Sequence, residues 1–98
     1  MDSEDKKTWQ LRLYVAGMTP TAQRALKNIQ EIAREHMEGE YDIEVVDLLE
    51  NPGLAEGEKI FAVPTLVRKL PPPLRKIVGD LSNTEKVLVG LDLRLEDE

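Results

Sequence analysis

The amino-acid sequence predicts one α/β domain of 98 residues with the element order βαβαββα, and three patterns lead to that prediction. Residues 9–16 alternate apolar and polar side chains, which is typical of a strand with one buried face. Residues 20–38 carry apolar side chains at helical spacing, and residues 41–49 form a second strand-like run. A strand, a helix and a second strand make a βαβ unit, so we expect these two strands to be parallel.

The first strand and the first helix have clear boundaries. On the strand, one face consists of Trp9, Leu11, Leu13 and Val15, and the other of Gln10, Arg12, Tyr14 and Ala16. Gly17 and Met18 turn the chain, and Thr19-Pro20 begins the helix with a capping hydroxyl and a proline at the first helical position. Gly39 is expected to end the helix. Its apolar stripe comprises Ala22, Ala25, Leu26, Ile29, Ile32, Ala33 and Met37.

The middle of the chain predicts a short helix and two further strands. Asn51-Pro52 repeats the pattern of a cap followed by proline and predicts a helix to about residue 59. Residues 64–67 form a strand in which Pro64 stands at the start or on an edge, because proline cannot donate to the ladder. The triple proline at 71–73 interrupts regular secondary structure. We interpret it as a structural element, in preference to a ligand for a domain that binds polyproline helices. Residues 74–78 form another strand, which ends at Gly79-Asp80.

The last third of the chain supports two incompatible secondary structures. As a helix, it begins with a Ser82–Glu85 capping box, and one face carries Val87, Leu88, Leu91 and Leu95. As a strand, it alternates Val87, Val89, Leu91, Leu93 and Leu95 with other residues. Gly90 costs a helix about 1 kcal/mol relative to alanine, and it also weakens a strand. The helix completes a thioredoxin-like domain, whereas the strand gives a different α+β packing of the C-terminal half.

Composition and charge exclude several classes of protein. The net charge is −6, with acidic residues at both termini, so the basic surface that phosphate binding requires is lacking. The chain has no apolar run long enough to span a membrane and no leader, and we expect a soluble cytoplasmic protein that binds neither nucleic acid nor membrane. We expect residues 1–98 to form a single domain, with flexible acidic ends at residues 1–8 and 96–98.

Catalytic chemistry has little support in the sequence. The chain contains no cysteine, which excludes disulfides, thiolate metal sites and thiol redox chemistry. In thioredoxin-like enzymes a Cys-x-x-Cys motif lies where the first strand turns into the first helix, and here residues 17–21 occupy that place. His36 beside acidic residues is read as a cation at a helix C-terminus, and Asp42, Glu44 and Asp47 as a solvated strand edge. We therefore predict no cofactor, no metal and no enzymatic activity.

A local basic patch stands out on this acidic chain. Its members flank the triple proline and are Arg68, Lys69, Arg75 and Lys76. One interpretation is a solvated rim that helps solubility. The other is docking to an acidic protein surface, where charge speeds encounter and fixes register.

Five segments carry a specific family resemblance: LRLYVAGMTP at 11–20, RALKNI at 24–29, NPGLAE at 51–56, VPTLVRKLPPPLRKIVGDLS at 63–82 and EKVLVGLDL at 85–93. Together they resemble the KaiB family of circadian-clock proteins, and the match covers residues 9–95 without gaps. The resemblance implies a non-enzymatic protein that binds the ATPase ring of KaiC. It also implies two folds, a self-associated ground state (tetramer or dimer) and a monomeric thioredoxin-like state that binds KaiC. In cyanobacterial clocks the bound state captures KaiA and competes with SasA, a histidine kinase with a thioredoxin-like sensor domain.

The resemblance also implies roles for individual residues. Partner-binding cations are Arg24, Lys59 and Arg75, to which the basic patch adds Arg68. The fold switch involves Gly90 and Asp92, and slow isomerisation of X-Pro bonds adds Pro64, Pro71, Pro72 and Pro73. We predict that Gly90→Ala favours the helical state by about 1 kcal/mol of helix propensity. Asp92→Arg is predicted to act in the same direction, by roughly 0.3–1 kcal/mol, through the helix dipole. The alternative is a free-standing thioredoxin-like sensor or adaptor domain that does not switch folds.

Overall fold

The structure is a computed structural model, and it describes residues 7–37 and 40–92. The elements follow the predicted order: β1 (Lys7–Val15), α1 (Pro20–His36), β2 (Glu40–Asp47), α2 (Gly53–Gly57), β3 (Thr65–Leu70), β4 (Arg75–Val78) and α3 (Thr84–Gly90). Strand β1 already includes Lys7 and Thr8, which the sequence had assigned to a flexible end. The predicted acidic ends at residues 1–6 and 96–98, and the predicted helix stop at Gly39, lie outside the described residues.

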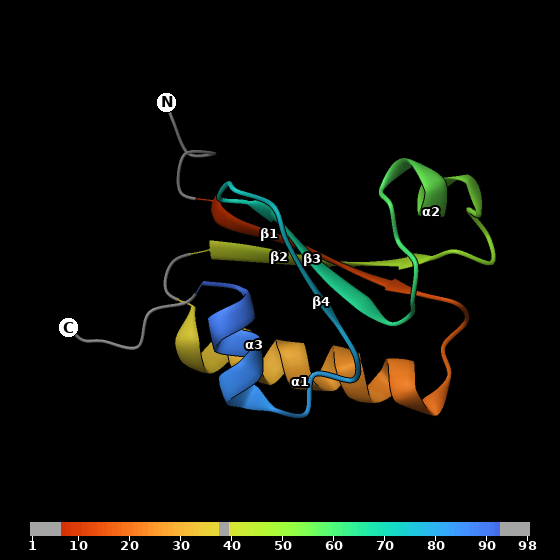
Figure 1. Cartoon of the computed structure of the whole chain (residues 1–98). Coiled ribbons are helices and arrows are strands. Elements are labelled where there is room, and N and C mark those ends of the chain that lie inside the picture. The colour runs from red at the N-terminus through yellow and green to blue at the C-terminus, as the bar shows by residue number, and fades with distance from the viewer. Residues whose placement is uncertain (1–6, 38–39, 93–98) are drawn as a thin grey trace.

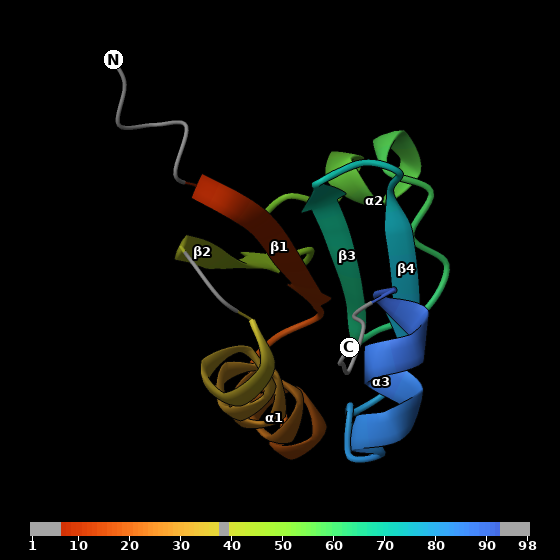
Figure 2. The same ribbon diagram turned by 90° about the vertical axis from the view of Figure 1, so that its left-hand side faces the viewer.

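The four strands form one mixed sheet in the order β2-β1-β3-β4. β1 and β2 are parallel, as the βαβ unit predicts, and β3 is antiparallel to both β1 and β4. Helices α1 and α3 lie side by side on one face of the sheet, and α2 lies on the opposite side (Figure 1 and Figure 2). The segment for which the sequence supports both a helix and a strand is therefore helical from Thr84 to Gly90 in this structure.

The main core fills the space between the sheet and helices α1 and α3. Helix α1 begins as predicted, because the Thr19 hydroxyl oxygen accepts a hydrogen bond from the Ala22 amide at 3.1 Å and Pro20 occupies the first turn. The apolar face of β1 packs against the buried stripe of α1. Helix α3 completes this core with Val87 and Leu88, and Leu91 follows at its C-cap. The predicted helical face at 87, 88 and 91 is thus buried, and Leu95 lies outside the described residues.

A second, smaller core lies on the other face of the sheet, where the sequence indicated a polar surface. Tyr14 was expected on the polar face of the first strand, but its exposed fraction is 0%. It packs with Val46, Val67 and Ile60 under the segment that contains α2. The expectation was wrong because the short helix and the residues after it return over this face and exclude water from it.

Two of the predicted helix caps differ in the structure. The N-cap of α3 is Asn83, whose side-chain oxygen accepts from the Lys86 amide at 3.1 Å. Ser82 was predicted to cap this helix, but its amide instead donates to the Asp80 carboxylate at 3.0 Å. Helix α2 has no side-chain cap, and Asn51 contributes its backbone carbonyl to the first turn. At α3 the neighbouring Asn83 supplies the capping oxygen, whereas at α2 backbone carbonyl oxygens of Asn51 and Pro52 accept from the amides of the first turn.

Pro64 stands immediately before β3, at the start of an internal strand, as predicted. Its carbonyl oxygen accepts from the Gly79 amide at 2.9 Å, which joins the start of β3 to the end of β4. The peptide bonds Val63–Pro64, Leu70–Pro71 and Pro72–Pro73 are cis.

Candidate functional site

The predicted basic patch does not form one surface. Adjacent residues of a strand point to opposite faces of a sheet, and β3 and β4 pair Arg68 with Arg75 and Val67 with Lys76. Lys69 and Lys76 therefore share the sheet face of α2, whereas Arg68 and Arg75 share the face of α3. The docking patch read from the sequence is divided between two sides of the molecule.

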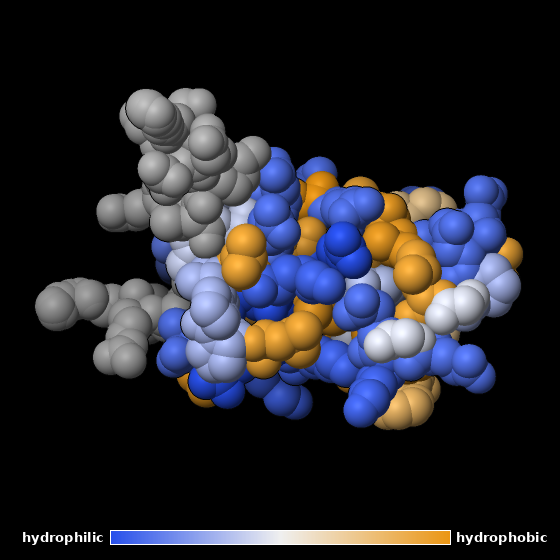
Figure 3. All heavy atoms as spheres, turned by 90° about the horizontal axis from the view of Figure 1, so that it is seen from above, coloured by the Kyte–Doolittle hydropathy of each residue, from blue (hydrophilic) through white to orange (hydrophobic). Residues whose placement is uncertain are grey.

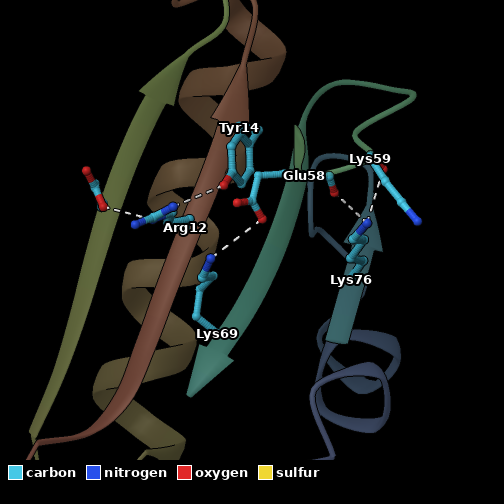
Figure 4. Close-up of polar contacts among 7 residues, drawn as sticks. Arg12, Tyr14, Glu58, Lys59, Lys69 and Lys76 are labelled. Atoms are coloured by element: carbon cyan, nitrogen blue, oxygen red, sulfur yellow. Dashed lines mark hydrogen bonds and ion pairs between the residues drawn. The ribbon is translucent and has the colours of Figure 1, made fainter. Parts of the chain in front are cut away.

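Polar side chains cover the sheet face that carries α2. Lys69 Nζ lies 3.5 Å from Glu58 Oε1, and Lys76 Nζ donates to the carbonyl oxygens of Glu58 at 2.8 Å and Lys59 at 3.1 Å (Figure 4). Arg12 Nε lies 3.0 Å from Glu44 Oε1 on the neighbouring strand. The pKa of Arg12 is raised, first by its hydrogen bond to the Tyr14 hydroxyl. Hydrophilic residues accordingly dominate the middle of this face, with small separate hydrophobic patches around them (Figure 3).

Lys59 belongs to the loop that follows α2, and its side chain is exposed. Its backbone is in the left-handed region at φ 59°, and its carbonyl oxygen is held by Lys76. The loop thereby presents the Lys59 side chain outward, as Figure 4 shows. This geometry is compatible with the partner-binding role that the resemblance implies.

Arg24 lies on α1, close to the loop that joins β4 to α3. Its Nε is 3.7 Å from Asp80 Oδ2, and its side chain remains more than half exposed. Asn28, one turn further along, donates from Nδ2 to the Asp80 carbonyl oxygen at 2.8 Å. The pKa of Asp80 is lowered, first by its hydrogen bonds with Ser82 and less by Arg24. An ion pair and a hydrogen bond thus connect the N-terminal half of α1 to the loop that precedes α3.

Arg68 is the predicted partner-binding residue that the structure removes from the surface. Its exposed fraction is 3%, and its guanidinium donates to the carbonyl oxygens of Leu91 and Pro73, the latter at 2.9 Å. The guanidinium carbon lies 5.7 Å from the centre of the Trp9 ring. Burial lowers the pKa of Arg68, Asp92 raises it, and Arg75 lowers it further. A partner that docks on this fold does not reach the Arg68 side chain.

Two of the predicted switch residues lie at the C-terminal end of α3, where Gly90 is the last helical residue and Asp92 follows the C-cap. A Cβ atom on Gly90 would lie 2.7 Å from Ile77 Cδ1 and 2.9 Å from Ile77 Cγ1. Asp92 follows the C-cap with φ 62°, and its carboxylate lies 3.9 Å from Arg75 Nη2. Leu81, before the helix, is buried at φ 65°. Non-glycine residues in the left-handed region therefore stand on both sides of α3, which is a mark of local strain.

The turn between β1 and α1 borders an open groove, at the place where thioredoxin-like enzymes carry their cysteines. The groove has a volume of about 330 Å³ and is lined by Val15, Ala16, Thr19, Thr21, Ala22, Val63 and Pro64. None of these side chains titrates. Phe61 lies close by in the chain and is 91% exposed.

The predicted carboxylate edge is largely engaged by the protein itself. Asp47 Oδ1 accepts from the amides of Gly17 and Leu49, both at 2.9 Å, and Glu44 pairs with Arg12. Within residues 7–37 and 40–92, no group of three or more acidic, histidine or cysteine side chains is placed to hold a metal ion. Over the same residues, no helix has the length and apolar character needed to cross a membrane.

Comparison with known proteins agrees with the sequence resemblance. The family model described as KaiB domain matches residues 12–93. The circadian clock oscillator proteins KaiB of Microcystis aeruginosa and Trichodesmium erythraeum are each 58% identical over 92 residues, which cover 94% of this chain and 88% of each relative. KaiB of Thermosynechococcus vestitus is 55% identical over 92 residues, covering 94% of this chain and 85% of the relative.

Two solved structures with the same fold are more distant in sequence than these relatives. The N-terminal domain of SasA from Synechococcus elongatus superposes with a TM-score of 0.73 at 19% identity, covering 94% of this chain and 90% of that domain. Mitochondrial thioredoxin 3 from Saccharomyces cerevisiae has a TM-score of 0.68 at 18% identity, covering 90% of this chain and 81% of that one. At these identities the likeness concerns the fold alone, which is thioredoxin-like.

Proposed function

Because this chain belongs to the KaiB family of circadian clock proteins, we propose that it is a non-enzymatic clock regulator that binds a KaiC-type ATPase ring in its thioredoxin-like state. One observation carries the proposal. A sequence that is 58% identical to KaiB clock proteins has, in this structure, a fold like that of the SasA N-terminal domain. Two clock proteins of one fold can present similar surfaces to one ring, so competition with a SasA-type kinase follows from the same proposal.

The proposed partner contacts are exposed cations, with Arg24 and Arg75 on the side of α1 and α3 and Lys59 on the side of α2. Arg24 and Arg75 have side chains that are 58% and 45% exposed, and Lys59 projects from the loop after α2. Exposed cations of this kind speed the encounter with an acidic surface and fix its register. Arg68 is left out of the surface because it is buried.

Further partners and states belong to the same proposal. In the ring-bound state the protein sequesters a KaiA-type partner in the cytoplasm, and in a resting state it self-associates as a tetramer or dimer. The C-terminal half then adopts the strand-containing alternative that the sequence also supports. A fold switch requires two packings that differ by only a few kcal/mol, and the strained residues at both ends of α3 keep the helical packing from being strongly favoured.

A timed binding assay tests the proposal. The protein is mixed with an ATP-loaded KaiC-type ring, and co-elution by size exclusion is followed from minutes to a day. We expect binding that develops over hours, because only the helical state is competent. Absence of any complex would overturn the proposal.

A matched pair of variants on α1 tests the surface. Arg24→Ala removes a proposed contact, whereas Lys27→Ala removes another exposed cation on the same helix. We expect Arg24→Ala to weaken ring binding several-fold more than Lys27→Ala. Equal effects would show that only net charge matters.

The second candidate is a free-standing thioredoxin-like adaptor that does not switch folds. The likeness to the SasA N-terminal domain favours it, since the helical state is already the described one. This candidate predicts ring binding that is complete within minutes, a persistent monomer and a single set of amide signals. Slow exchange between tetramer and monomer would exclude it.

A further inference from the structure

Arg68 lies where three separated parts of the chain meet. It projects from the internal strand β3 toward the face that carries α3, where it reaches the Leu91 carbonyl. One terminal nitrogen donates to the Leu91 carbonyl at the end of α3, and the other donates to the Pro73 carbonyl in the turn between β3 and β4 at 2.9 Å. The Trp9 ring from β1 covers the guanidinium. A single buried guanidinium therefore contacts the end of a helix, a turn and an aromatic ring.

Helix α3 needs such an attachment more than α1 does. It has seven residues, whereas α1 has 17. A helix this short is not stable by itself in water, so it depends on tertiary contacts. The last carbonyl groups of any helix lack partners within the helix, and a cation near them is favourable. Arg68 supplies both the donor and the charge at a place that water does not reach, because Leu91 is fully buried.

We propose that Arg68 is the positioning residue that holds α3 against the sheet, and that it acts as a latch for the helical C-terminal half. The Arg68 guanidinium donates to backbone carbonyls, so the latch does not depend on which side chains α3 carries. Its consequence for ring binding rests on the proposed function. The latch itself concerns only the free protein.

Arg75 provides a matched control on the same face of the sheet. It pairs directly with Arg68 across β3 and β4, but its side chain is 45% exposed and it approaches the Asp92 carboxylate at 3.9 Å. Arg68→Met and Arg75→Met make the same change in charge and a similar change in shape. Only the first removes donors from the Leu91 and Pro73 carbonyls.

The experiment is amide hydrogen exchange of the free protein, read residue by residue by NMR. The amides of Val87, Leu91 and Asp92, each bonded to a carbonyl within α3 or its N-cap, report on α3. The Ile29 amide reports on α1. In Arg68→Met we expect exchange in α3 to become at least about tenfold faster, because a hydrogen bond from a charged group is lost at a buried carbonyl. We expect Ile29 to be unchanged, and Arg75→Met to move neither set.

Rescue by the conservative variant separates positioning from general stability. In Arg68→Lys, a single ammonium keeps the charge but not the planar fork, so we expect intermediate exchange in α3 only. If Arg68→Met does not fold, Arg68→Lys carries the same contrast with Arg75→Lys. Equal acceleration in α1 and α3, or no acceleration in α3, would overturn the latch. If Arg68→Met accelerates amide exchange in α3 as expected but the wild-type protein does not bind the ring, the latch stands and the proposed function is refuted.

Discussion

Gly90→Ala is the most informative substitution in helix α3, because two effects of similar size oppose each other there. Gly90 does not have a positive φ, so alanine fits its backbone, and helix propensity favours alanine by at most about 1 kcal/mol. The new Cβ, however, would lie 2.7 Å from Ile77 Cδ1 and 2.9 Å from Ile77 Cγ1. Ile77 is only partly buried, so its side chain can turn aside at a cost of about 0.5–1.5 kcal/mol for an unfavourable rotamer. Sequence alone predicts the gain and misses the opposing contact.

A double-mutant cycle separates the two effects. Ile77→Ala removes both carbon atoms that the new Cβ would meet, so we expect Gly90→Ala to stabilise α3 by about 1 kcal/mol in that background. In the wild-type background we expect less than half of this gain. The assay is amide exchange at Leu91 and Asp92 together with the free energy of unfolding in denaturant, for all four proteins. If Gly90→Ala has the same effect in both backgrounds to within about 0.3 kcal/mol, the contact with Ile77 is not what limits the gain.

Four further substitutions test the ends of α3 and the loop before it. Asn83→Ala is expected to lower the free energy of unfolding by about 1 kcal/mol through loss of the cap. Ser82→Ala, at the position that sequence favoured, is expected to cost less in the same denaturation assay, because it removes a side-chain hydrogen bond with Asp80 and no cap. Asp92→Gly is expected to slow α3 amide exchange, because glycine adopts φ 62° without steric cost; faster exchange would mean that the carboxylate near Arg75 matters more. Because the pKa of Asp80 is depressed, its contribution to stability is present above the unfolded pKa and is lost as pH falls through the folded one. Asp80→Asn should therefore flatten the dependence of Tm on pH below about pH 4, and an unchanged profile would contradict this linkage.

The first half of the fold could be predicted from sequence because its patterns are one-sided. Alternation in β1 and the stripe of α1 each point to a single buried face, and Thr19-Pro20 marks the helix start without competition. Tyr14 shows the limit of this reasoning. Its burial depends on a later segment that includes Ile60 and returns over the opposite face, and no pattern within β1 encodes that return.

The basic patch was wrongly predicted as one surface because its residues are close in sequence but lie on opposite faces of the sheet. Strand parity alone separates Arg68 from Lys69, and that signal was available without a structure. What sequence could not supply is the depth of Arg68, since arginine is rarely buried without a partner. Its partners are the backbone carbonyls of Leu91 and Pro73. Every residue has such a carbonyl, so the sequence does not show which ones Arg68 meets until α3 and the proline turn are folded beside it.

The ambiguity of the C-terminal segment in sequence has a counterpart in the energetics of α3. The Asn83 cap, the burial of Val87 and Leu88 and the Arg68 fork favour the helix. Strain at Leu81 and Asp92 opposes it, since left-handed backbone costs an L-residue roughly 1–2 kcal/mol. These effects are individually of similar size, so no single one makes the helix strongly favoured. Regulation through this segment then requires only a change of one or two such contacts, and Arg68 is the proposed contact that can be removed without changing any apolar side chain of the core that α3 completes.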